Sequence, residues 1–194
     1  MNQNKHIYLI AGEESGDFIG GGLIESLRRK LNGHIMLSGI GGQQMQQAGL
    51  TSLFPMQELS LMGFAEIIPH IFALKRRIRE TVADIIAKKP DLIVTIDSPG
   101  FNCRVVEQLR ELQLNLCPII HYVAPTVWAY KPHRALKTAK LFDSLLTLLP
   151  FEPPYFTVHG LDTHFVGHPA AWFWKERGDA QSFRAKHQIP HDSI

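Results

Sequence analysis

The stretch Leu92-Ile93-Val94-Thr95-Ile96-Asp97-Ser98-Pro99-Gly100-Phe101-Asn102 decides the fold. Its first five residues form a continuous, largely apolar run, which is typical of a strand buried on both faces of a parallel sheet. The run ends at Asp97, and Ser98-Pro99-Gly100 marks a turn before a helix predicted from Asn102 to Leu112. A buried strand, a polar turn and a helix in this order form the repeating unit of an α/β fold.

The same alternation extends in both directions from this stretch. Further strands are predicted at Ile7–Ile10, Ile35–Ile40, Ile119–Val123 and Leu145–Leu149. Helices are predicted from Asp17 to about Leu31, from Phe64 to Lys88 with an interruption near Pro69, and from Arg134 to Lys140. Several of the strands are apolar throughout, so we predict a Rossmann-like, doubly wound α/β fold with a mainly parallel sheet.

Composition excludes several classes of protein. The 194 residues are 45% hydrophobic and 20% charged, which is typical of a globular chain and not of a disordered one. Twenty Lys and Arg against eighteen Asp and Glu give a net charge of +2, which does not favour nucleic acid as a partner. Two cysteines, Cys103 and Cys117, have no ligand or redox spacing, which indicates reduced thiols in a cytosolic protein.

The two ends of the sequence bear on targeting and on domain organisation. Met1–Lys5 is polar and runs into a strand, so we expect no signal peptide. No stretch approaches the ~18 to 20 apolar residues that span a bilayer, so any membrane contact is expected to be peripheral. Gly167-His168-Pro169 breaks the rhythm of strands and helices. We predict one Rossmann-like domain over residues 1–168, and a linker with the start of a second domain over 169–194, including a short helix at Asp179–Gln188.

Polar residues follow the predicted strands at four places: Gly12–Asp17, Gly39–Gly42, Asp97–Asn102 and His121–Arg134. In an open α/β sheet, ligands bind beyond the carboxyl ends of the strands, so we expect these segments to converge. The first contains Glu13, Glu14 and Asp17, whose carboxylates favour sugar hydroxyls over a phosphate. A tight turn in which Ser15 or Asp17 caps the helix explains this loop equally well.

Asp97 and the loop beyond His121 carry the strongest chemical signals. Asp97 ends an apolar strand, where partial desolvation suits a general base, although a helix cap is the alternative. After His121 the chain combines aromatic side chains, which stack on sugar rings, with cations, which pair with phosphates. These residues are Tyr122, Trp128, Tyr130, Lys131, His133 and Arg134. The regular spacing of Arg134, Lys137 and Lys140 also fits a solvated helix face.

Two further patterns leave alternatives open. Apolar residues from Phe64 to Leu74 precede a basic cluster at Lys75–Arg79, which suits an anionic membrane interface, yet a core-packed helix has the same pattern. Ten histidines include His164 and His168, but no recognisable ligand set accompanies them, so we predict no metal.

Taken together, several motifs resemble those of the lipid-A-disaccharide synthases, and they occur in that family's order. The motifs are Ala11-Gly12-Glu13-Glu14-Ser15-Gly16-Asp17, Met62-Gly63-Phe64-Ala65-Glu66, Lys89-Pro90-Asp91, Ile96–Asn102, His121-Tyr122-Val123-Ala124-Pro125-Thr126-Val127-Trp128-Ala129-Tyr130, Leu149-Pro150-Phe151-Glu152 and Phe165–Pro169. The His121–Tyr130 run is the most specific. The resemblance covers about Ile7 to Ala170.

This resemblance implies the N-terminal, acceptor-side half of a GT-B glycosyltransferase whose donor half is absent. It implies transfer of 2,3-diacylglucosamine from UDP-2,3-diacylglucosamine to 2,3-diacylglucosamine 1-phosphate, with inversion and without a metal or cofactor, in Gram-negative lipid A assembly. The family acts in the cytoplasm, peripherally associated with the anionic inner-membrane surface, and homo-oligomers are compatible with it. Because the residues that would hold UDP are missing, we expect this chain alone to be inactive.

The resemblance also implies residue roles. Asp97 matches the base that takes the proton of the acceptor 6-hydroxyl. The resemblance implies that the substrates are bound by Glu13, Ser15, Gly16, Asp17, Asn102, Tyr122, Trp128, Tyr130, Lys131 and Arg134. Membrane contacts fall on Phe64, Ile67, Ile68, Ile71, Phe72, Leu74, Arg76 and Arg77. Glu14, Gly100 and Pro69 depart from the family's usual pattern. A non-catalytic lipid-binding module and a UDP-sugar epimerase-like enzyme are the alternatives.

Overall fold

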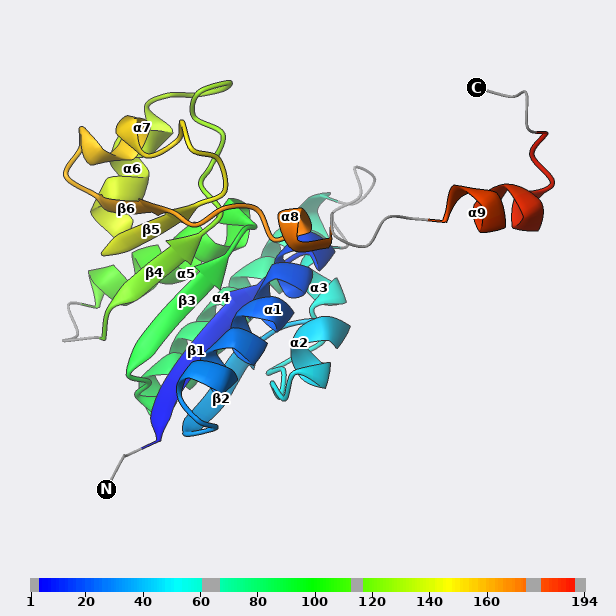
Figure 1. Cartoon of the computed structure of the whole chain (residues 1–194). Helices are drawn as coiled ribbons and strands as arrows, with labels where there is room; N and C mark the ends of the chain where they lie inside the picture. The colour runs from blue at the N-terminus through cyan, green and yellow to red at the C-terminus, as the bar shows by residue number, and fades with distance from the viewer. Residues whose placement is uncertain (1–3, 61–66, 113–116, 174–178, 191–194) are drawn as a thin grey trace.

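A computed structural model describes residues 4–60, 67–112, 117–173 and 179–190. Its strands form one sheet in which every pair of neighbours is parallel, in the order β2-β1-β3-β4-β5-β6 (Figure 1). The strands are β1 (Lys5–Ala11), β2 (Ile35–Ile40), β3 (Leu92–Ile96), β4 (Ile119–Tyr122), β5 (Ser144–Thr147) and β6 (Asp162–Phe165). The predicted doubly wound, Rossmann-like α/β fold is confirmed.

Helices cover the sheet from two sides. The long ones are α1 (Glu14–Lys30), α4 (Ile67–Lys88) and α5 (Pro99–Glu111). The shorter ones are α2 (Gln43–Gln47), α3 (Gln57–Ser60), α6 (Arg134–Leu141), α7 (Pro154–Thr157), α8 (Ala170–Phe173) and α9 (Ala180–His187). Figure 1 shows α1 in front of the sheet and α4, α5 and α6 behind it, and α4 contacts α5 while α5 contacts α6.

The apolar strands form the centre of the core. Tyr8, Ile10 and Ile96 are fully buried between the two helix layers. On the α1 side the helix lies almost on the backbone of β3, because a Cβ added at Gly16 would lie 3.2 Å from the carbonyl oxygen of Ile96. Glycine at this position therefore allows α1 to pack directly on the sheet.

The strand order indicates at which end of the sheet ligands bind. From β1 the chain moves to β2 on one side and then crosses back to β3 on the other, so the order reverses between β1 and β3. The loops that leave these two strands run in opposite directions and open a crevice at their carboxyl ends. The glycine-rich loop after β1 and the Asp97 turn after β3 both begin at this crevice.

The structure differs from the predictions at four elements. Helix α1 begins at Glu14, within the segment up to Asp17 that was predicted to be a loop. Helix α4 runs through Pro69 without a break, because Pro69 lies in the first turn of the assigned helix, where its missing N–H is not needed. Helix α5 begins at Pro99 and not at Asn102. Strand β6 was not predicted, because the short sequence Asp162-Thr163-His164-Phe165 is largely polar and lies at the sheet edge.

The last described helix lies apart from the sheet. Figure 1 shows α9 separated from the other elements, and none of its residues is buried. Its N-cap, Asp179, accepts hydrogen bonds from the backbone N–H groups of Gln181 and Ser182. The short helix predicted at Asp179–Gln188 is thus confirmed, whereas the assignment of 169–194 to a linker and a second domain stays a prediction.

Within the described ranges, no helix combines the length and the apolar character needed to cross a bilayer. The two cysteines, Cys103 and Cys117, are unpaired and half-buried. Burial raises the pKa of both thiols, which disfavours the reactive thiolate form.

Candidate functional site

The turn after β3 has a strained backbone. Asp97 and Ser98 both adopt left-handed conformations, with φ of 51° and 42°, although neither is a glycine. Each such residue costs on the order of 1 kcal/mol or more and persists only where its surroundings enforce it. Here Asn102 holds this backbone conformation in place. Its buried side-chain amide donates hydrogen bonds to the carbonyl oxygens of Ile96 at 3.2 Å and Asp97 at 2.7 Å.

The Asp97 carboxylate is oriented by two donors. Its Oδ1 accepts a hydrogen bond of 2.9 Å from the backbone N–H of Ser98, and its Oδ2 accepts one of 2.9 Å from the Ser15 hydroxyl. Each oxygen keeps capacity for another hydrogen bond. The side chain is half-buried, as predicted. We call Ser15 together with Ile96–Asn102 the Asp97 corner.

Ser15 belongs to the first turn of α1, so its bond to Asp97 joins the loop after β1 to the turn after β3. The two loops meet so closely that a Cβ added at Gly12 would lie 2.5 Å from the Ser98 hydroxyl oxygen. The preceding acidic residues, Glu13 and Glu14, are exposed beside this junction. The corner thus presents a held carboxylate with further acidic groups next to it, which suits hydrogen bonding to hydroxyls.

Asp17 has a different role from the one predicted. It is 4% exposed, and its two oxygens accept backbone N–H bonds from Gly42, Gln44 and Met45 at 2.8 to 3.0 Å. It therefore caps α2 and fixes that helix to α1.

The predicted substrate contacts of Asp17, Gly16 and Asn102 are accordingly corrected. Gly16 is buried against β3, and the Asn102 amide nitrogen is used by two backbone carbonyls. The Oδ1 atom of Asn102 is buried without a hydrogen-bond partner among the described residues. All three residues shape the site from inside the protein, where a sugar does not reach them.

Strand β4 supplies a buried histidine and a tyrosine next to the corner. His121 is buried, its Nδ1 lies 2.7 Å from the Thr95 hydroxyl, and its ring stacks on Phe142 at 4.6 Å. Desolvation lowers the pKa of His121 to about 4, so the ring is neutral at pH 7. Tyr122 follows, and its carbonyl oxygen accepts a 2.9 Å hydrogen bond from the backbone N–H of Asp97.

The loop after β4 is anchored by buried Ala124 and Val127 and is exposed from Trp128 to Arg134. We call residues 123–134 the aromatic-basic loop. The Trp128 ring makes an edge contact with Phe151 at 5.4 Å, while Tyr130 is 62% exposed. The Lys131 ammonium lies 4.7 Å, and the Arg134 guanidinium 5.8 Å, from the centre of the Tyr130 ring. The structure thus brings Tyr130, Lys131 and Arg134 together on the surface.

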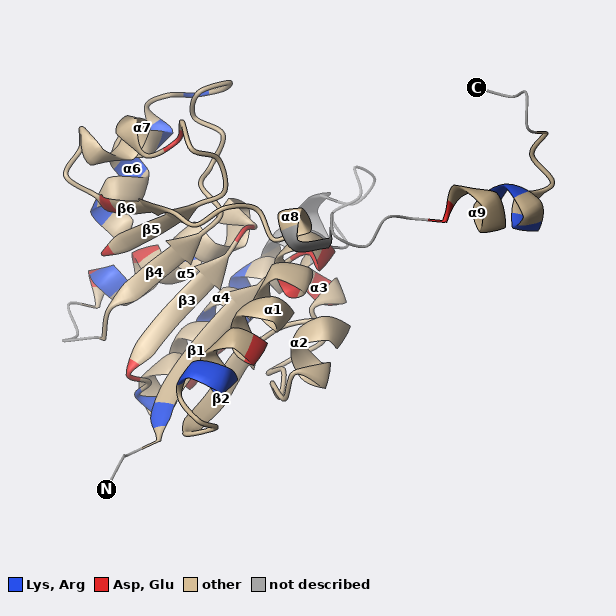
Figure 2. Ribbon diagram, viewed as in Figure 1, with Lys and Arg blue, Asp and Glu red and all other residues tan. Residues whose placement is uncertain are grey.

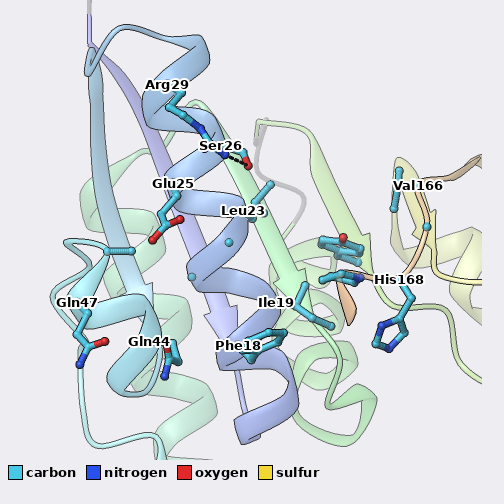
Figure 3. Close-up of a pocket in the computed structure, with 16 residues that line it drawn as sticks. Phe18, Ile19, Leu23, Glu25, Ser26, Arg29, Gln44, Gln47, Val166 and His168 are labelled. Atoms are coloured by element: carbon cyan, nitrogen blue, oxygen red, sulfur yellow. Dashed lines mark hydrogen bonds between the residues drawn. The ribbon is translucent and has the colours of Figure 1, made fainter. Parts of the chain in front are cut away.

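A groove lies beside helix α1, and sequence reasoning did not find it. It has a volume of about 670 Å³, within the size range of small-molecule sites, and its lining includes Phe18, Ile19, Gly22, Leu23, Tyr122 and Val166 (Figure 3). We call it the α1 groove. Tyr122 belongs to its lining, but Asp97 and Ser15 do not. The groove is formed by α1, α2, the end of β4 and the segment after β6 together, so no local sequence pattern predicts it.

The predicted membrane segment is described in part. Phe64 lies outside the described residues, and Ile67, Ile68 and Ile71 lie in the first turns of α4. Phe72 is 67% exposed, whereas Leu74 packs against the core.

The two basic residues of this segment differ. Arg76 is exposed, with its guanidinium 3.8 Å from Glu58. Arg77 is only 14% exposed; it pairs with Glu58 and Glu80 and lies 4.4 Å above the Phe54 ring. Its membrane contact is therefore corrected: Arg77 fastens α4 to α3.

Both signs of charge are found on the helices. Figure 2 shows Lys and Arg interspersed with Asp and Glu on helices such as α1, while strands β2, β3, β4 and β5 carry none of these residues. In the part of the chain that the structure describes, no three His, Cys, Asp or Glu side chains gather as a metal site. His164 pairs with Asp162 at the sheet edge, and His168 accepts a hydrogen bond from the backbone N–H of Ala170.

Comparisons with known proteins show which family the chain resembles. The sequence model of a family described as lipid-A-disaccharide synthetase matches residues 7–194. The lipid-A-disaccharide synthase of Rhodospirillum centenum is 48% identical over 187 residues, covering 96% of this chain and 46% of that protein. The one from Rickettsia bellii is 55% identical over 166 residues, covering 85% of this chain and 43% of that protein. The chain spans about half the length of the curated relatives it matches.

A solved structure supports the fold. The chain is similar to a crystal structure of a glycosyltransferase from Rickettsia africae, with a TM-score of 0.52 and 10% sequence identity. The match covers 99% of this chain and 51% of that one. At this identity the likeness concerns the fold alone, and it agrees with a sheet domain that forms about half of a larger architecture.

Proposed function

The chain belongs to the lipid-A-disaccharide synthetase family, and we propose that it forms the acceptor-binding half of a GT-B glycosyltransferase. The Asp97 corner is the observation that carries this proposal. It holds one carboxylate at the carboxyl end of β3, at the point where the strand order reverses, with both oxygens oriented by hydrogen bonds. In an open α/β sheet this is the position at which ligands bind.

The proposed reaction joins UDP-2,3-diacylglucosamine to 2,3-diacylglucosamine 1-phosphate. Asp97 takes the proton of the acceptor 6-hydroxyl while that oxygen attacks the anomeric carbon of the donor. The bond from the anomeric carbon to the diphosphate breaks, its electron pair leaves with UDP, and a β-1,6 linkage results. The Ser15 hydroxyl keeps the carboxylate turned toward the acceptor by holding Oδ2.

The aromatic-basic loop is proposed to bind the acceptor's head. Trp128 and Tyr130 offer ring faces to the sugar, and Lys131 and Arg134 offer charge to the 1-phosphate. Glu13 is proposed to accept hydrogen bonds from sugar hydroxyls, because it is exposed next to Ser15. In this proposal the reacting hydroxyl of the acceptor lies at the rigid Asp97 corner, and its sugar ring and phosphate contact the exposed aromatic-basic loop.

Peripheral binding to the cytoplasmic face of an anionic membrane is part of the proposal. The start of α4 is its candidate surface, with Ile67, Ile68, Ile71 and exposed Phe72 followed by Arg76. Replacing the three isoleucines with serine is expected to reduce flotation with anionic vesicles while far-UV circular dichroism stays unchanged. Equal flotation of variant and parent would remove α4 from the proposal.

The catalytic proposal is tested by disaccharide formation in detergent from both lipid substrates, with a labelled acceptor. The chain is assayed alone and together with the donor half of the Rhodospirillum centenum relative. We expect no product from the chain alone and product from the mixture, since residues 169–194 are proposed to lead into a donor domain. Asp97→Asn should lower the rate by roughly 100-fold or more.

A matched control separates the chemistry from a general loss of charge. Glu111→Gln neutralises an exposed carboxylate at the far end of α5 and should leave the rate unchanged. Unaltered activity of Asp97→Asn in the complemented assay would exclude Asp97 as the base. Lipid binding without product in every mixture would favour a non-catalytic lipid-binding module.

A further inference from the structure

The α1 groove and the Asp97 corner share helix α1. Ser15 donates to Asp97, and Phe18, Ile19, Gly22, Leu23 and Ser26 follow it along α1 at helical spacing on one face. From Ser15 to Ser26 this face is about 16 Å long. Tyr122 lines the groove and adjoins the corner, because its carbonyl oxygen accepts the Asp97 backbone N–H. The lining of the groove thus begins within one helical turn of the residue that orients Asp97.

Glycine at position 22 is not explained by packing within the fold. A Cβ at Gly20 would lie 2.5 Å from the Met45 sulfur, and one at Gly21 would lie 3.2 Å from Gln44, so α2 requires both of those glycines. At Gly22 a Cβ would meet no described atom within 4 Å. Glycine is unfavourable in a helix interior, and here its main consequence is to leave the groove open along α1.

The groove also contains a tyrosine hydroxyl. Tyr122 is 9% exposed and lines the groove, and none of the described residues gives its hydroxyl a hydrogen bond. The hydroxyl oxygen itself is open to the groove, because among the described residues Asn102 Oδ1 is the buried side-chain atom that lacks a partner. The ligand that fills the groove is therefore expected to offer an acceptor atom near Tyr122.

The remaining lining decides the class of ligand. Its apolar side chains include Phe18, Ile19, Leu23 and Val166, and its uncharged polar side chains include Ser26, Gln44, Gln47 and His168. Its Asp, Glu, Lys and Arg members are Glu25 and Arg29, whose charges balance, which does not suit a diphosphate. A groove with an apolar stretch and a few polar groups fits a hydrocarbon chain attached through a carbonyl group.

We propose that the α1 groove binds one acyl chain of the acceptor, with the Tyr122 hydroxyl donating to the carbonyl oxygen of that chain's ester or amide linkage. This inference rests on the proposed function, which supplies a diacylated acceptor. The acyl chain runs from Tyr122 toward Ser26 and passes Gly22, where no side chain fills the groove. Burial of the hydrocarbon supplies affinity, and the hydrogen bond fixes where the sugar starts relative to Asp97.

The test uses the 194-residue chain and measures the affinity for 2,3-diacylglucosamine 1-phosphate and for glucosamine 1-phosphate, which lacks the acyl chains. Gly22→Leu fills the groove and should weaken binding of the diacylated probe at least tenfold. The same change should raise Tm by about 2 to 4 °C, since leucine favours a helix more than glycine. Tyr122→Phe should weaken binding about 3- to 10-fold through the lost hydrogen bond.

Lys30→Leu is the matched control, because it places the same side chain at an exposed position of α1 outside the groove. It should bind both probes like the parent. Gly22→Ala serves as a second, smaller filling and should give an intermediate affinity.

The outcomes distinguish a failure of this inference from a failure of the proposed function on which it rests. Parent-like binding of the diacylated probe by Gly22→Leu would overturn the groove assignment and leave the proposed function intact. Failure of the parent chain to bind the diacylated probe would overturn the proposed function itself. If Gly22→Leu changes the sedimentation of the chain without changing lipid affinity, a second copy occupies the groove and the acyl-chain assignment is wrong.

Discussion

The Asp97 corner and the aromatic-basic loop follow neighbouring strands, β3 and β4, yet they differ in how firmly they are held. In the corner, Asn102 and Ser15 tie two strained residues and one carboxylate to buried backbone. In the loop, Tyr130 and Lys131 are exposed and contact mainly each other. A proton acceptor must be placed within a fraction of an ångström, whereas a sugar or phosphate contact tolerates adjustment. From this difference we propose that the rigid part of the site carries the chemistry and that the exposed part selects the ligand.

The largest expected effect tests the rigidity of the corner. Asn102→Ala removes two hydrogen bonds to buried carbonyl groups and leaves a cavity, so it should lower the free energy of unfolding by about 2 to 4 kcal/mol. Urea denaturation followed by circular dichroism measures this. Glu111→Ala, at an exposed position on the same helix, is the control and should change stability by less than about 0.5 kcal/mol. Equal effects of the two changes would show that the corner is not anchored by Asn102.

The second effect concerns pH and the buried ring beside the corner. In the folded chain the pKa of His121 is about 4, below its ordinary value of 6.5. The unfolded chain therefore binds more protons between these values, so the stability that His121 contributes is complete above pH 6.5 and is lost as pH falls toward 4. The loss should reach about 3 kcal/mol.

Urea midpoints of the parent and of His121→Gln at pH 7.5, 5.5 and 4.5 measure this loss. The difference in midpoint between the two proteins should shrink as the pH falls, because only the parent loses this contribution. A constant difference across this range would show that His121 does not titrate below its ordinary pKa.

A smaller effect separates orientation from stability within the corner. Ser15→Ala removes the donor to Asp97 Oδ2 but exposes no buried group, because Ser15 lies at the surface. The rate in the complemented disaccharide assay should fall about tenfold, corresponding to one hydrogen bond to a charged group, with little change in Tm. Ser15→Thr keeps the hydroxyl and should retain most of the activity. A parent-like rate for Ser15→Ala would contradict the orienting role.

The smallest structural effect belongs to the aromatic-basic loop. Tyr130→Ala should change the free energy of unfolding by less than about 0.5 kcal/mol, because the ring is exposed. The same variant should raise KM for the acceptor more than it lowers kcat, since the ring is proposed to contact bound ligand. A loss of stability as large as that of Asn102→Ala would abolish the distinction between the two regions.

Sequence alone predicted the central sheet because its signals are local. The apolar runs at Ile7–Ile10, Leu92–Ile96 and Ile119–Val123 are confirmed as strands, since a strand buried on both faces needs such a run whatever surrounds it. Asp97 is predicted as a candidate from an equally local signal, because it is the polar residue at which a buried strand ends. Strand β6 escaped prediction because a polar edge strand lacks that signal.

What the tertiary structure decided depends on partners far away in the chain. The sequence shows that Asp17 is acidic, but only the fold turns it toward the N–H groups of Gly42, Gln44 and Met45. The sequence likewise shows that Arg77 is basic, but only the fold pairs it with Glu58. The α1 groove is lined by four separate segments, from α1, α2, the end of β4 and the stretch after β6. A buried strand can be predicted from a short run of apolar residues. The partner of a charged side chain and the walls of a cavity cannot, because they come from distant segments that meet only in the folded structure.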